Sequence, residues 1–348
     1  MNLQNHLVSK NTTVKEALFK LNVLGSDALL FVVDDQQRLI GSLTDGDIRR
    51  GILNNLNLDS PLTDFINKAP KVLHKKEYSI DKVIEYRNEG YKIIPLIDHD
   101  GVIYDVLNFR LSKSFLPIEA ILMAGGRGER LKPLTDNTPK PLLKVGDKSI
   151  IRHNIDHLIN YGIKNIHISI GYLGNKIIES LEDVKASGID IKYIDERTPL
   201  GTIGAASQAQ LDNHDDVLVI NSDILTNINY EDFYLDFITK QARLSILAVP
   251  YKVNVPYAVL ETINESVISF KEKPTYTYYS NGGIYLMKKS CLDHIPPNAF
   301  YNSTDLMELL ISRGEKVLSY HLRDYWLDIG KPDDYIKAQE DIKHINFK

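Results

Sequence analysis

The chain has 348 residues, a formal net charge of −5, 43% hydrophobic and 25% charged residues, and one cysteine, Cys291. This mixture is typical of a globular protein, and the length predicts two domains or three. The single cysteine excludes an internal disulfide framework, and the acidic balance gives no reason to expect a nucleic-acid partner. No apolar run reaches membrane-spanning length and the first residues lack the order of a signal peptide. We therefore expect a cytoplasmic protein with no membrane partner.

The N-terminal third contains an internal repeat. The segment Phe31-Val32-Val33-Asp34 has a counterpart in Pro95-Leu96-Ile97-Asp98, 64 residues further along. The pattern predicts that each unit contains a helix, a strand, a turn, a second strand and another helix. Because a unit of this size cannot bury its sheet alone, we expect the two to pack into one module. We place this module at residues 1–117, with repeats at about 1–60 and 61–117.

Strands and helices alternate from residue 118 to the end of the chain. Strands are predicted at Ile118–Met123, Ile166–Ile170, Ile191–Ile194, Val217–Ile220 and Leu244–Val249. Helices are predicted between them, at Ile151–Tyr161, Asn175–Val184, Thr202–Ala209 and Tyr230–Lys240. This alternation predicts an α/β domain at residues 118–348, with a Rossmann-like, mixed but mostly parallel sheet and helices on both faces.

A glycine-rich loop follows the first predicted strand of this domain. Its three glycines, Gly125, Gly126 and Gly128, let the backbone approach a ligand and present N–H groups to an anion. The loop fits neither the Walker pattern nor the dinucleotide fingerprint. Residues 124–144 hold five basic and two acidic residues, and two prolines enclose Lys140. The pattern favours a polyphosphate ligand over the alternative, a solvated basic face beside an ordinary turn.

The loop belongs to a longer motif. Gly125-Gly126-x-Gly128-x-Arg130-Leu131-x-Pro133-Leu134-Thr135, followed by Pro139-Lys140-Pro141, resembles the signature of sugar-1-phosphate nucleotidyltransferases. The resemblance covers 118–348 and implies that a sugar-1-phosphate oxygen attacks the α-phosphate of a nucleoside triphosphate, releasing pyrophosphate and forming an NDP-sugar. Because that oxygen is already an anion, the reaction needs charge neutralisation and alignment rather than a general base. Glu129 departs from the threonine of many members, so the loop does not identify the base.

The resemblance also implies roles for individual residues. Arg130 would neutralise the phosphates during transfer, and Lys140 would bind the attacking phosphate or the α-phosphate. Asp223, just after a predicted strand, and Asp328, in Trp326-Leu327-Asp328-Ile329-Gly330, would hold Mg²⁺. The alternative from position alone, a turn or helix-capping role for Asp223, is the less favoured one. The nucleotide-binding residues that the resemblance implies are Ala124, Gly125, Gly126, Gly128, Glu196, Gly201 and Thr202.

Three later segments resemble the sugar side of the family's site. Lys271-Glu272-Lys273-Pro274 would bind sugar hydroxyls through Glu272 and the sugar phosphate through Lys273, although a charge run is usually a solvated face. Asn281-Gly282-Gly283-Ile284-Tyr285 resembles the strand that lines the sugar pocket. Tyr257-Ala258-Val259 departs from the common Tyr-Gly-Val, which puts a side chain beside the sugar. The sugar-phosphate-binding residues implied are Tyr257, Glu272, Lys273, Asn281 and Gly283.

The first repeat resembles a cystathionine-β-synthase (CBS) unit. Its segment Leu39–Arg50 includes Thr44 and Asp47, which the resemblance implies bind the phosphate and ribose of a regulatory nucleotide. The repeat offset places Leu111 opposite Asp47, so the second unit lacks the ribose acceptor. We therefore expect a tandem CBS module of α+β type with one competent nucleotide site or none, the alternative being a purely architectural or dimerising pair.

The domain combination resembles the glucosamine-1-phosphate guanylyltransferase-like branch of the family. On that resemblance we expect GTP and a sugar 1-phosphate as substrates, a homo-oligomer, and a role in making surface-glycan or nonulosonic-acid precursors. UTP, dTTP and CTP stay open as the triphosphate, and mannose, heptose and hexosamine phosphates stay open as the acceptor. Two other hypotheses are a non-catalytic nucleotide sensor and a glycosyltransferase. The second requires a metal-binding Asp-x-Asp, where this chain has Asn221 in the first position.

Overall fold

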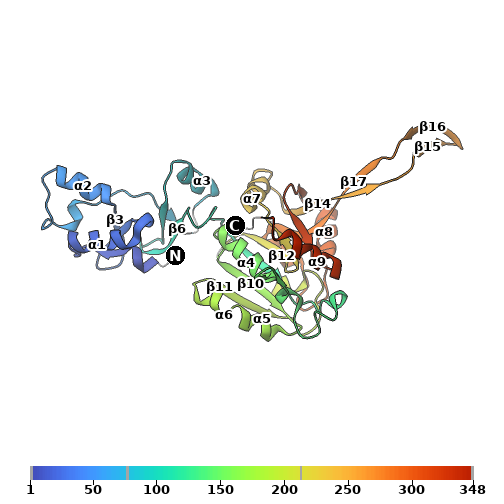
Figure 1. Cartoon of the computed structure of the whole chain (residues 1–348), viewed down its shortest axis with the longest axis horizontal. Helices are drawn as coiled ribbons and strands as arrows, with labels where there is room; N and C mark the ends of the chain where they lie inside the picture. The colour runs from blue at the N-terminus through green and yellow to red at the C-terminus, as the bar shows by residue number, and fades with distance from the viewer. Residues whose placement is uncertain (1–2, 76–77, 212–213, 346–348) are drawn as a thin grey trace. The chain divides into compact units, whose positions relative to one another are not determined.

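The structure, a computed structural model, describes residues 3–75, 78–211 and 214–345. Its contacts divide the chain into two compact units. Unit 1 comprises Met1–Pro117 with Asn160–Gly162, and unit 2 comprises Ile118–Ile159 with Ile163–Lys348. In Figure 1, unit 1 runs from blue to cyan along the chain and unit 2 continues from green to red.

Unit 1 contains two small sheets, one from each repeat. In both sheets the first strand runs parallel to the middle strand, and the third strand runs antiparallel to it. The strands are β1 (Leu7–Ser9), β2 (Leu30–Val33) and β3 (Leu39–Leu43) in the first repeat, and β4 (Leu73–His74), β5 (Ile93–Ile97) and β6 (Ile103–Asn108) in the second. The helices are α1 (Val14–Leu24), α2 (Asp45–Leu53) and α3 (Ile80–Asn88).

The second repeat ends without the helix that its sequence pattern predicts. In the first repeat, Thr44 caps α2 and forms a capping box with Asp47. After β6, the Asn108 Oδ1 accepts a hydrogen bond from the Arg110 backbone N–H at 2.9 Å, which closes a turn. The described chain then reaches the next strand at Ile118 without a further helix. The physical reason is that Leu111 has no carboxylate to complete a capping box as Asp47 does.

Unit 2 is built on a seven-stranded sheet, counted over the described ranges. Its order is β11-β10-β7-β12-β17-β14-β18, and every neighbouring pair is parallel except those that include β17. The predicted α/β fold with a mostly parallel sheet is therefore confirmed. The strands are β7 (Ile118–Met123), β10 (Asn165–Ile170), β11 (Asp190–Asp195), β12 (Asp216–Asn221), β14 (Leu244–Asn254), β17 (Thr275–Lys288) and β18 (Val317–His321).

The chain changes direction across the sheet between β7 and β12. It runs from β7 through α4 (Ile150–Asn160) to β10, continues to β11, and then returns past β7 to β12. Right-handed crossovers in opposite directions place their connections on opposite faces of the sheet. One face packs against the 3₁₀ helices η6 (Gly204–Gln208) and η7 (Lys289–His294) and against α8 (Ser303–Ser312). Such a point of reversal is where open α/β sheets bind ligands.

Two predicted helices differ in the structure. The segment predicted as one helix at 175–184 forms α5 (Gly174–Ser180) and α6 (Glu182–Ala186), which are separated at Leu181. The segment predicted at 202–209 forms only the five-residue 3₁₀ helix η6. The small side chains of this second segment allow close packing, and the segment is too short to sustain an α-helix alone.

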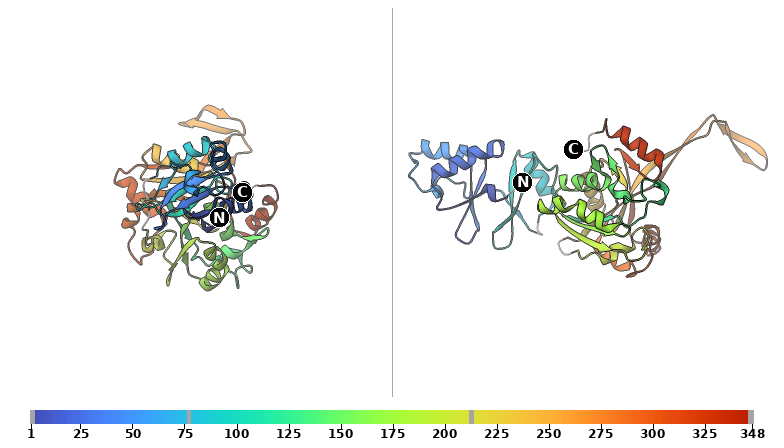
Figure 2. Two further views of the ribbon diagram at one scale, coloured as in Figure 1. Left: turned by 90° about the vertical axis from the view of Figure 1, so that its left-hand side faces the viewer. Right: turned by 60° about the horizontal axis from the view of Figure 1, so that its bottom comes forward.

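The strands β14 and β17 continue past the sheet as a ribbon. They pair as far as Asn254 and Thr275, and the ribbon ends in β15 (Val259–Ile263) and β16 (Ser266–Lys271). Figures 1 and 2 show this projection in every view. We call residues 250–280 the arm.

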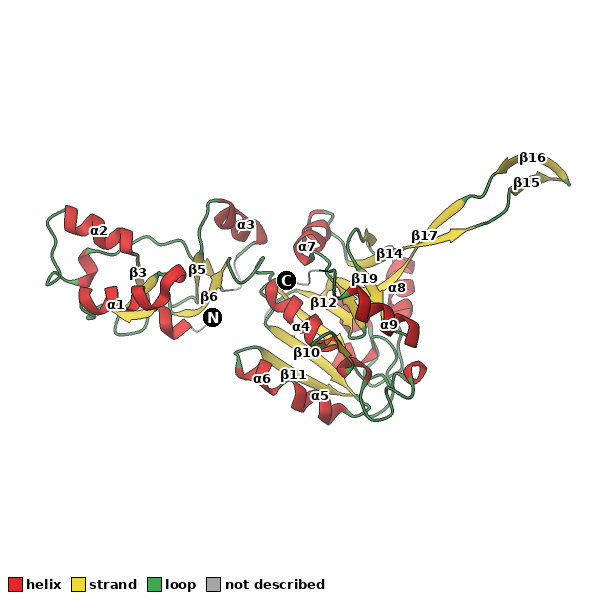
Figure 3. Ribbon diagram, in the orientation of Figure 1, coloured by secondary structure: helices red, strands yellow, loops and turns green. Residues whose placement is uncertain are grey.

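The remaining elements surround the ends of the strands (Figure 3). β13 (Ile224–Thr226) pairs with β19 (Trp326–Asp328), and β8 (Lys144–Val145) pairs with β9 (Lys148–Ser149). The helices are α7 (Tyr230–Thr239) and α9 (Pro332–Asp341). Within the described residues, none of the helices combines the length and apolar character needed to cross a membrane.

Candidate active site

The glycine-rich loop leaves β7 under tight spatial constraints. The Ala124 N–H donates hydrogen bonds to both Ser169 oxygens, the backbone at 3.1 Å and Oγ at 3.0 Å. A Cβ at Gly125 would lie 2.4 Å from the Glu196 Oε1, so the carboxylate occupies the space that any larger residue would need. Gly128 has φ +65°, and its Cβ would lie 2.9 Å from the Lys140 Cβ. The backbone and the acidic side chain therefore approach each other only because glycine stands here.

The basic part of the loop forms hydrogen bonds and a cation–π contact with the segment that follows β10. The Tyr172 hydroxyl donates to the Asp136 carbonyl at 2.7 Å, and the Lys176 Nζ donates to the Asn137 carbonyl at 2.6 Å. Arg127 lies over the Tyr172 ring, 5.8 Å from its centre. These contacts hold a positively charged loop in one conformation.

Lys140, Asp223 and Asp328 converge from three distant parts of the chain. Lys140 is only 7% exposed, and its Nζ donates a hydrogen bond to the Asp223 Oδ2. The same Nζ lies 3.8 Å from the Asp328 Oδ1. The pairing of β13 with β19 sets Ile224 opposite Asp328, which brings the two aspartates together. The result is a compact group of one cation and two anions.

This group fits a divalent metal ion. Burial and the charge of Asp223 raise the pKa of Asp328 above its usual range, and Lys140 and Arg130 oppose that rise. The Asp328 Oδ1 is shielded from solvent and has no hydrogen-bond partner. Two adjacent carboxylates, one with an oxygen left unsatisfied, are the kind of ligand set that a hard divalent cation uses together with substrate phosphates.

Two adjoining cavities are lined by Asp223, the smaller one also by Lys140, and neither by Asp328. The larger, of about 530 Å³, is lined by predicted nucleotide-binding residues, namely Gly125, Gly126, Glu196, Gly201 and Thr202, together with Asn221 and Asp223. The smaller, of about 350 Å³, shares Met123, Gly126 and Asp223 with it and is lined also by Ala124, Gly128, Arg130 and Lys140. The structure thus brings the predicted catalytic and nucleotide-binding residues to one place, at the reversal between β7 and β12.

Thr202 lies at the cavity with its hydroxyl already engaged. Its Oγ1 accepts a hydrogen bond from the Ser303 N–H at 2.8 Å at the start of α8. Gly201 has φ +81°, and its Cβ would lie 2.5 Å from the Tyr301 carbonyl oxygen. Both residues therefore join this loop to the segment before α8, in addition to lining the cavity.

Sequence reasoning missed several side chains that line the larger cavity, among them Tyr172, Arg197 and Phe300. Phe300 is 65% exposed, and an exposed aromatic ring at a nucleotide cavity can stack on a base. No sequence signal points to Phe300. It reaches the cavity because the neighbouring Tyr301 backbone packs closely against Gly201.

The five predicted sugar-side residues fall into two groups. Gly283 lies at the cleft, because a Cβ added to it would be 2.6 Å from the Asn221 Nδ2. The Asn281 Oδ1 accepts a hydrogen bond from the Gly283 N–H at 2.9 Å. Tyr257, Glu272 and Lys273 lie on the arm, and none of them lines either cavity. The pairing of β14 with β17 extends the arm away from the sheet, so the structure does not bring these three residues to the cleft of their own chain.

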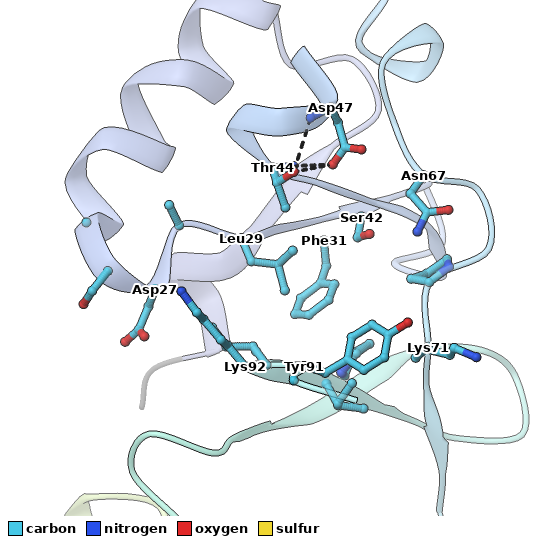
Figure 4. Close-up of a pocket in the computed structure, with 18 of the residues that line it drawn as sticks. Asp27, Leu29, Phe31, Ser42, Thr44, Asp47, Asn67, Lys71, Tyr91 and Lys92 are labelled. Atoms are coloured by element: carbon cyan, nitrogen blue, oxygen red, sulfur yellow. Dashed lines mark hydrogen bonds between the residues drawn. The ribbon is translucent and has the colours of Figure 1, made fainter. Parts of the chain in front are cut away.

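Unit 1 holds a separate cavity of about 580 Å³ between its two repeats (Figure 4). Thr44 and Asp47 line it from the first repeat, and Tyr91 and Lys92 line it from the second. The Asp47 Oδ2 accepts hydrogen bonds from the Thr44 N–H at 2.8 Å and the Thr44 hydroxyl at 2.6 Å. The two predicted regulatory residues therefore already cap α2, whether or not a ligand binds.

Residues 119–345 match the family described as nucleotidyl transferase, and the chain belongs to this family. Residues 1–54 match the CBS domain. These matches confirm the resemblance inferred from the motifs. Members of the family generally use a divalent metal ion.

The chain is similar to named enzymes. It is 31% identical over 230 residues to D-glycero-α-D-manno-heptose 1-phosphate guanylyltransferase of Aneurinibacillus thermoaerophilus, covering 65% of this chain and 99% of that enzyme. It is 30% identical over 228 residues to mannose-1-phosphate guanyltransferase of Schizosaccharomyces pombe, covering 63% of this chain and 62% of that enzyme, so it spans less than two thirds of this relative. The crystal structure of HddC from Yersinia pseudotuberculosis complexed with GMP-PN superposes with a TM-score of 0.52 at 26% identity, over 65% of this chain and 99% of HddC.

Proposed function

We propose that this protein transfers a nucleoside monophosphate from a nucleoside triphosphate to a sugar 1-phosphate, giving an NDP-sugar and pyrophosphate. The observation that carries the proposal is that Asp223 lines two adjoining cavities, paired with Lys140, whose Nζ lies 3.8 Å from the Asp328 Oδ1. With a divalent cation bound at its two carboxylates and Arg130 nearby, this group of side chains would suit a reaction in which two phosphates must approach each other against repulsion. An anionic nucleophile needs no general base.

In this reaction Lys140 and Arg130 offset the negative charge of the phosphates. Both side chains line the smaller cavity, and Lys140 is held there by its buried hydrogen bond to Asp223. The backbone N–H groups of the loop from Gly125 to Gly128 bind the triphosphate, as such loops do for anions. Glu196 and Thr202 line the larger cavity, and we propose that the base and ribose bind beside them.

Asp223 and Asp328 would hold the metal ion, for which we propose Mg²⁺. The unsatisfied Asp328 Oδ1 supports this assignment, as does the preference of Mg²⁺ for one or two carboxylates together with substrate phosphates. When bound, the ion would supply further neutralisation of phosphate charge.

We propose GTP as the triphosphate, because the relatives described above are named guanylyltransferases. Their names also favour a mannose-type or heptose-type 1-phosphate, and the domain combination favours a hexosamine phosphate, as the acceptor. A cytoplasmic location and a role in surface-glycan precursor synthesis would follow from such a product.

A matrix of GTP, UTP, dTTP and CTP against mannose, heptose and glucosamine 1-phosphates, with and without Mg²⁺, tests the proposal. We expect pyrophosphate release that requires both substrates and the metal, with the highest rate in a GTP well. Absence of turnover in every well, together with tight nucleotide binding, would contradict it and favour the alternative of a non-catalytic nucleotide sensor.

We further propose that unit 1 binds a regulatory nucleotide. Its cavity combines the Asp47 carboxylate with Lys71 and Lys92 and with an apolar wall that includes Phe31 (Figure 4). A carboxylate suits ribose hydroxyls, lysines suit phosphates, and an apolar wall suits a base. The architectural alternative predicts that no nucleotide binds in this cavity.

A further inference from the structure

The tip of the arm has one polar and one apolar face. On the polar face, the Lys271 Nζ lies 3.1 Å from the Glu261 Oε1. On the other face, Leu260 stands directly opposite Phe270 across the ribbon, and Ile268 follows two positions along. Successive side chains of a strand point to opposite faces, so this alternation is typical of a ribbon with one buried face.

Nothing in the described part of the chain covers that apolar face. Leu260, Ile268 and Phe270 are 56%, 59% and 65% exposed, and β15 and β16 pair only with each other. A two-stranded ribbon is at best marginally stable alone in water, and a contiguous exposed apolar patch marks an interaction surface. Ten large apolar or aromatic side chains of the arm are exposed: Tyr251, Val253, Tyr257, Leu260, Ile263, Val267, Ile268, Phe270, Tyr278 and Tyr279.

The cleft of unit 2 lacks contacts from the part of the chain that includes the arm. Among the described residues, those lining its two cavities include none between 224 and 299. Tyr257, Glu272 and Lys273, which the family resemblance assigns to the sugar 1-phosphate, all lie on the arm. As described, one chain supplies the nucleotide side of the site together with Gly283, and holds Tyr257, Glu272 and Lys273 elsewhere.

The geometry of the ribbon favours delivery of these residues to another molecule. β14 and β17 pair continuously from Ala248 and Asn281 to Asn254 and Thr275, which stiffens the ribbon. At about 3.3 Å per residue, the distance along the chain from Pro250 to Ile263 is roughly 40 Å. A stiff ribbon of this length carries its tip away from its own sheet, as Figure 1 and the right view of Figure 2 show.

We propose that two copies of this chain exchange arms. The apolar face of each arm packs on unit 2 of the other copy beside the cleft, and Glu272 and Lys273 complete the sugar-phosphate side of that cleft. This second part rests on the proposed function. Burying the five exposed aromatic side chains of both arms would remove on the order of 1,000 Å² from water, a large part of the roughly 1,600 Å² that a stable interface buries.

The first experiment measures the molecular mass of the full chain by sedimentation. We expect at least twice the 39.5 kDa of one chain, and half the wild-type mass for the double variant Leu260→Lys, Phe270→Lys. The matched control, Phe19→Lys with Val23→Lys, changes two side chains that are 70% and 69% exposed on α1, outside both the arm and unit 2, and should keep the wild-type mass. A monomeric wild type, or arm and control variants of equal mass, would overturn the proposal.

The second experiment asks whether the arm acts on its own cleft or on that of the other copy. The cleft variant Asp223→Asn and the arm variant Glu272→Ala, Lys273→Ala are co-expressed with different tags, and mixed dimers are isolated by two affinity steps. Each variant alone should be at least 100-fold below wild type. In a mixed dimer with exchanged arms, one site has an intact cleft and an intact arm, so we expect about half the wild-type turnover.

Mixed dimers as inactive as the two parent variants would show that each arm serves its own cleft, which overturns the exchange. Near-wild-type turnover of the arm variant alone would overturn the contribution of Glu272 and Lys273. If the wild type itself releases no pyrophosphate with any substrate pair, the proposed function fails, whereas the sedimentation result still decides whether the arm joins two copies.

Discussion

The Lys140 ammonium donates a hydrogen bond to the Asp223 carboxylate across 83 positions of the sequence. Lys140 lies on the loop that follows β7, and Asp223 lies just past the end of β12, the neighbouring strand. The order of the strands therefore creates the contact. In a largely buried pair, each group compensates the charge of the other, so removing one partner leaves an uncompensated charge. This pair supports the fold of the cleft as well as its chemistry.

The two roles of Lys140 can be separated with a double-variant cycle. We expect Lys140→Met to lower turnover by about 100-fold or more, the usual effect of losing one charge-stabilising group, and to lower the unfolding temperature because Asp223 loses its partner. Adding Asp223→Asn should recover part of the stability and none of the turnover. Pyrophosphate release and thermal unfolding measure the two effects. A double variant less stable than Lys140→Met would contradict the pairing.

Arg130 should matter for turnover and little for stability. It lines the smaller cavity beside the phosphate loop, and its contribution is charge presented to the substrates. We expect Arg130→Ala to lower turnover by about 100-fold with a nearly unchanged unfolding temperature. Lys132→Ala is the matched control, since Lys132 is an exposed cation of the same loop that lines neither cavity. Equal losses in the two variants would show that only the overall charge of the loop counts.

Asp328 should bind the metal ion, and its buried charge should lower the stability of the metal-free protein. Its pKa is raised in the folded state, so the free energy of unfolding that it contributes falls as the pH rises through that pKa. An amide side chain at this position cannot ionise, and metal-free Asp328→Asn should therefore be at least as stable as wild type at neutral pH, with the difference shrinking in acid. Mg²⁺ should raise the unfolding temperature of wild type and hardly that of the variant. Equal Mg²⁺ shifts in both proteins would contradict the assignment.

The sequence predicts the nucleotide side of the cleft because the residues there belong to ordered motifs at strand ends. Arg130 and Lys140 follow β7 closely, and Asp223 ends an apolar run, so the rule that ligands bind at the carboxyl ends of parallel strands already brings them together. Phe300 could not be predicted in this way. Its place at the cavity depends on the close approach of Gly201 to the Tyr301 carbonyl, a contact that links residues 100 positions apart.

The arm shows a different limit of sequence reasoning. The apolar run from Leu244 to Val249 predicts a strand, and β14 continues to Asn254 because Tyr251 and Val253 pair with Tyr278 and Tyr276. Alternation within the arm indicates a ribbon with one buried face, yet it contains no information on which surface covers that face. The last helix of the second repeat was predicted wrongly for a related reason, because strand similarity between repeats does not extend to the residues that start a helix.

A final prediction concerns the regulatory cavity of unit 1, where Asp47 caps α2 through Thr44 and also lines the cavity. Asp47→Ala removes both the capping box and the carboxylate that lines the cavity. The effect of this variant on nucleotide binding therefore needs a control that removes only a capping box. Glu16 offers one, since it forms the same capping box with Thr13 at α1 and does not line the cavity. Each variant should destabilise the protein by about 1 kcal/mol, with a small further loss in Asp47→Ala because Asp47 also pairs with Arg50.

Nucleotide binding should then separate the two variants. In calorimetric titrations of the full chain with ATP, ADP, AMP and GTP, the number of nucleotides bound per chain should fall by one in Asp47→Ala and stay at the wild-type value in Glu16→Ala. Counting sites distinguishes this cavity from the cleft of unit 2, which binds nucleotide in both variants. Unchanged stoichiometry in Asp47→Ala would mean that Thr44 and Asp47 serve only to start α2, and unit 1 would then have an architectural role.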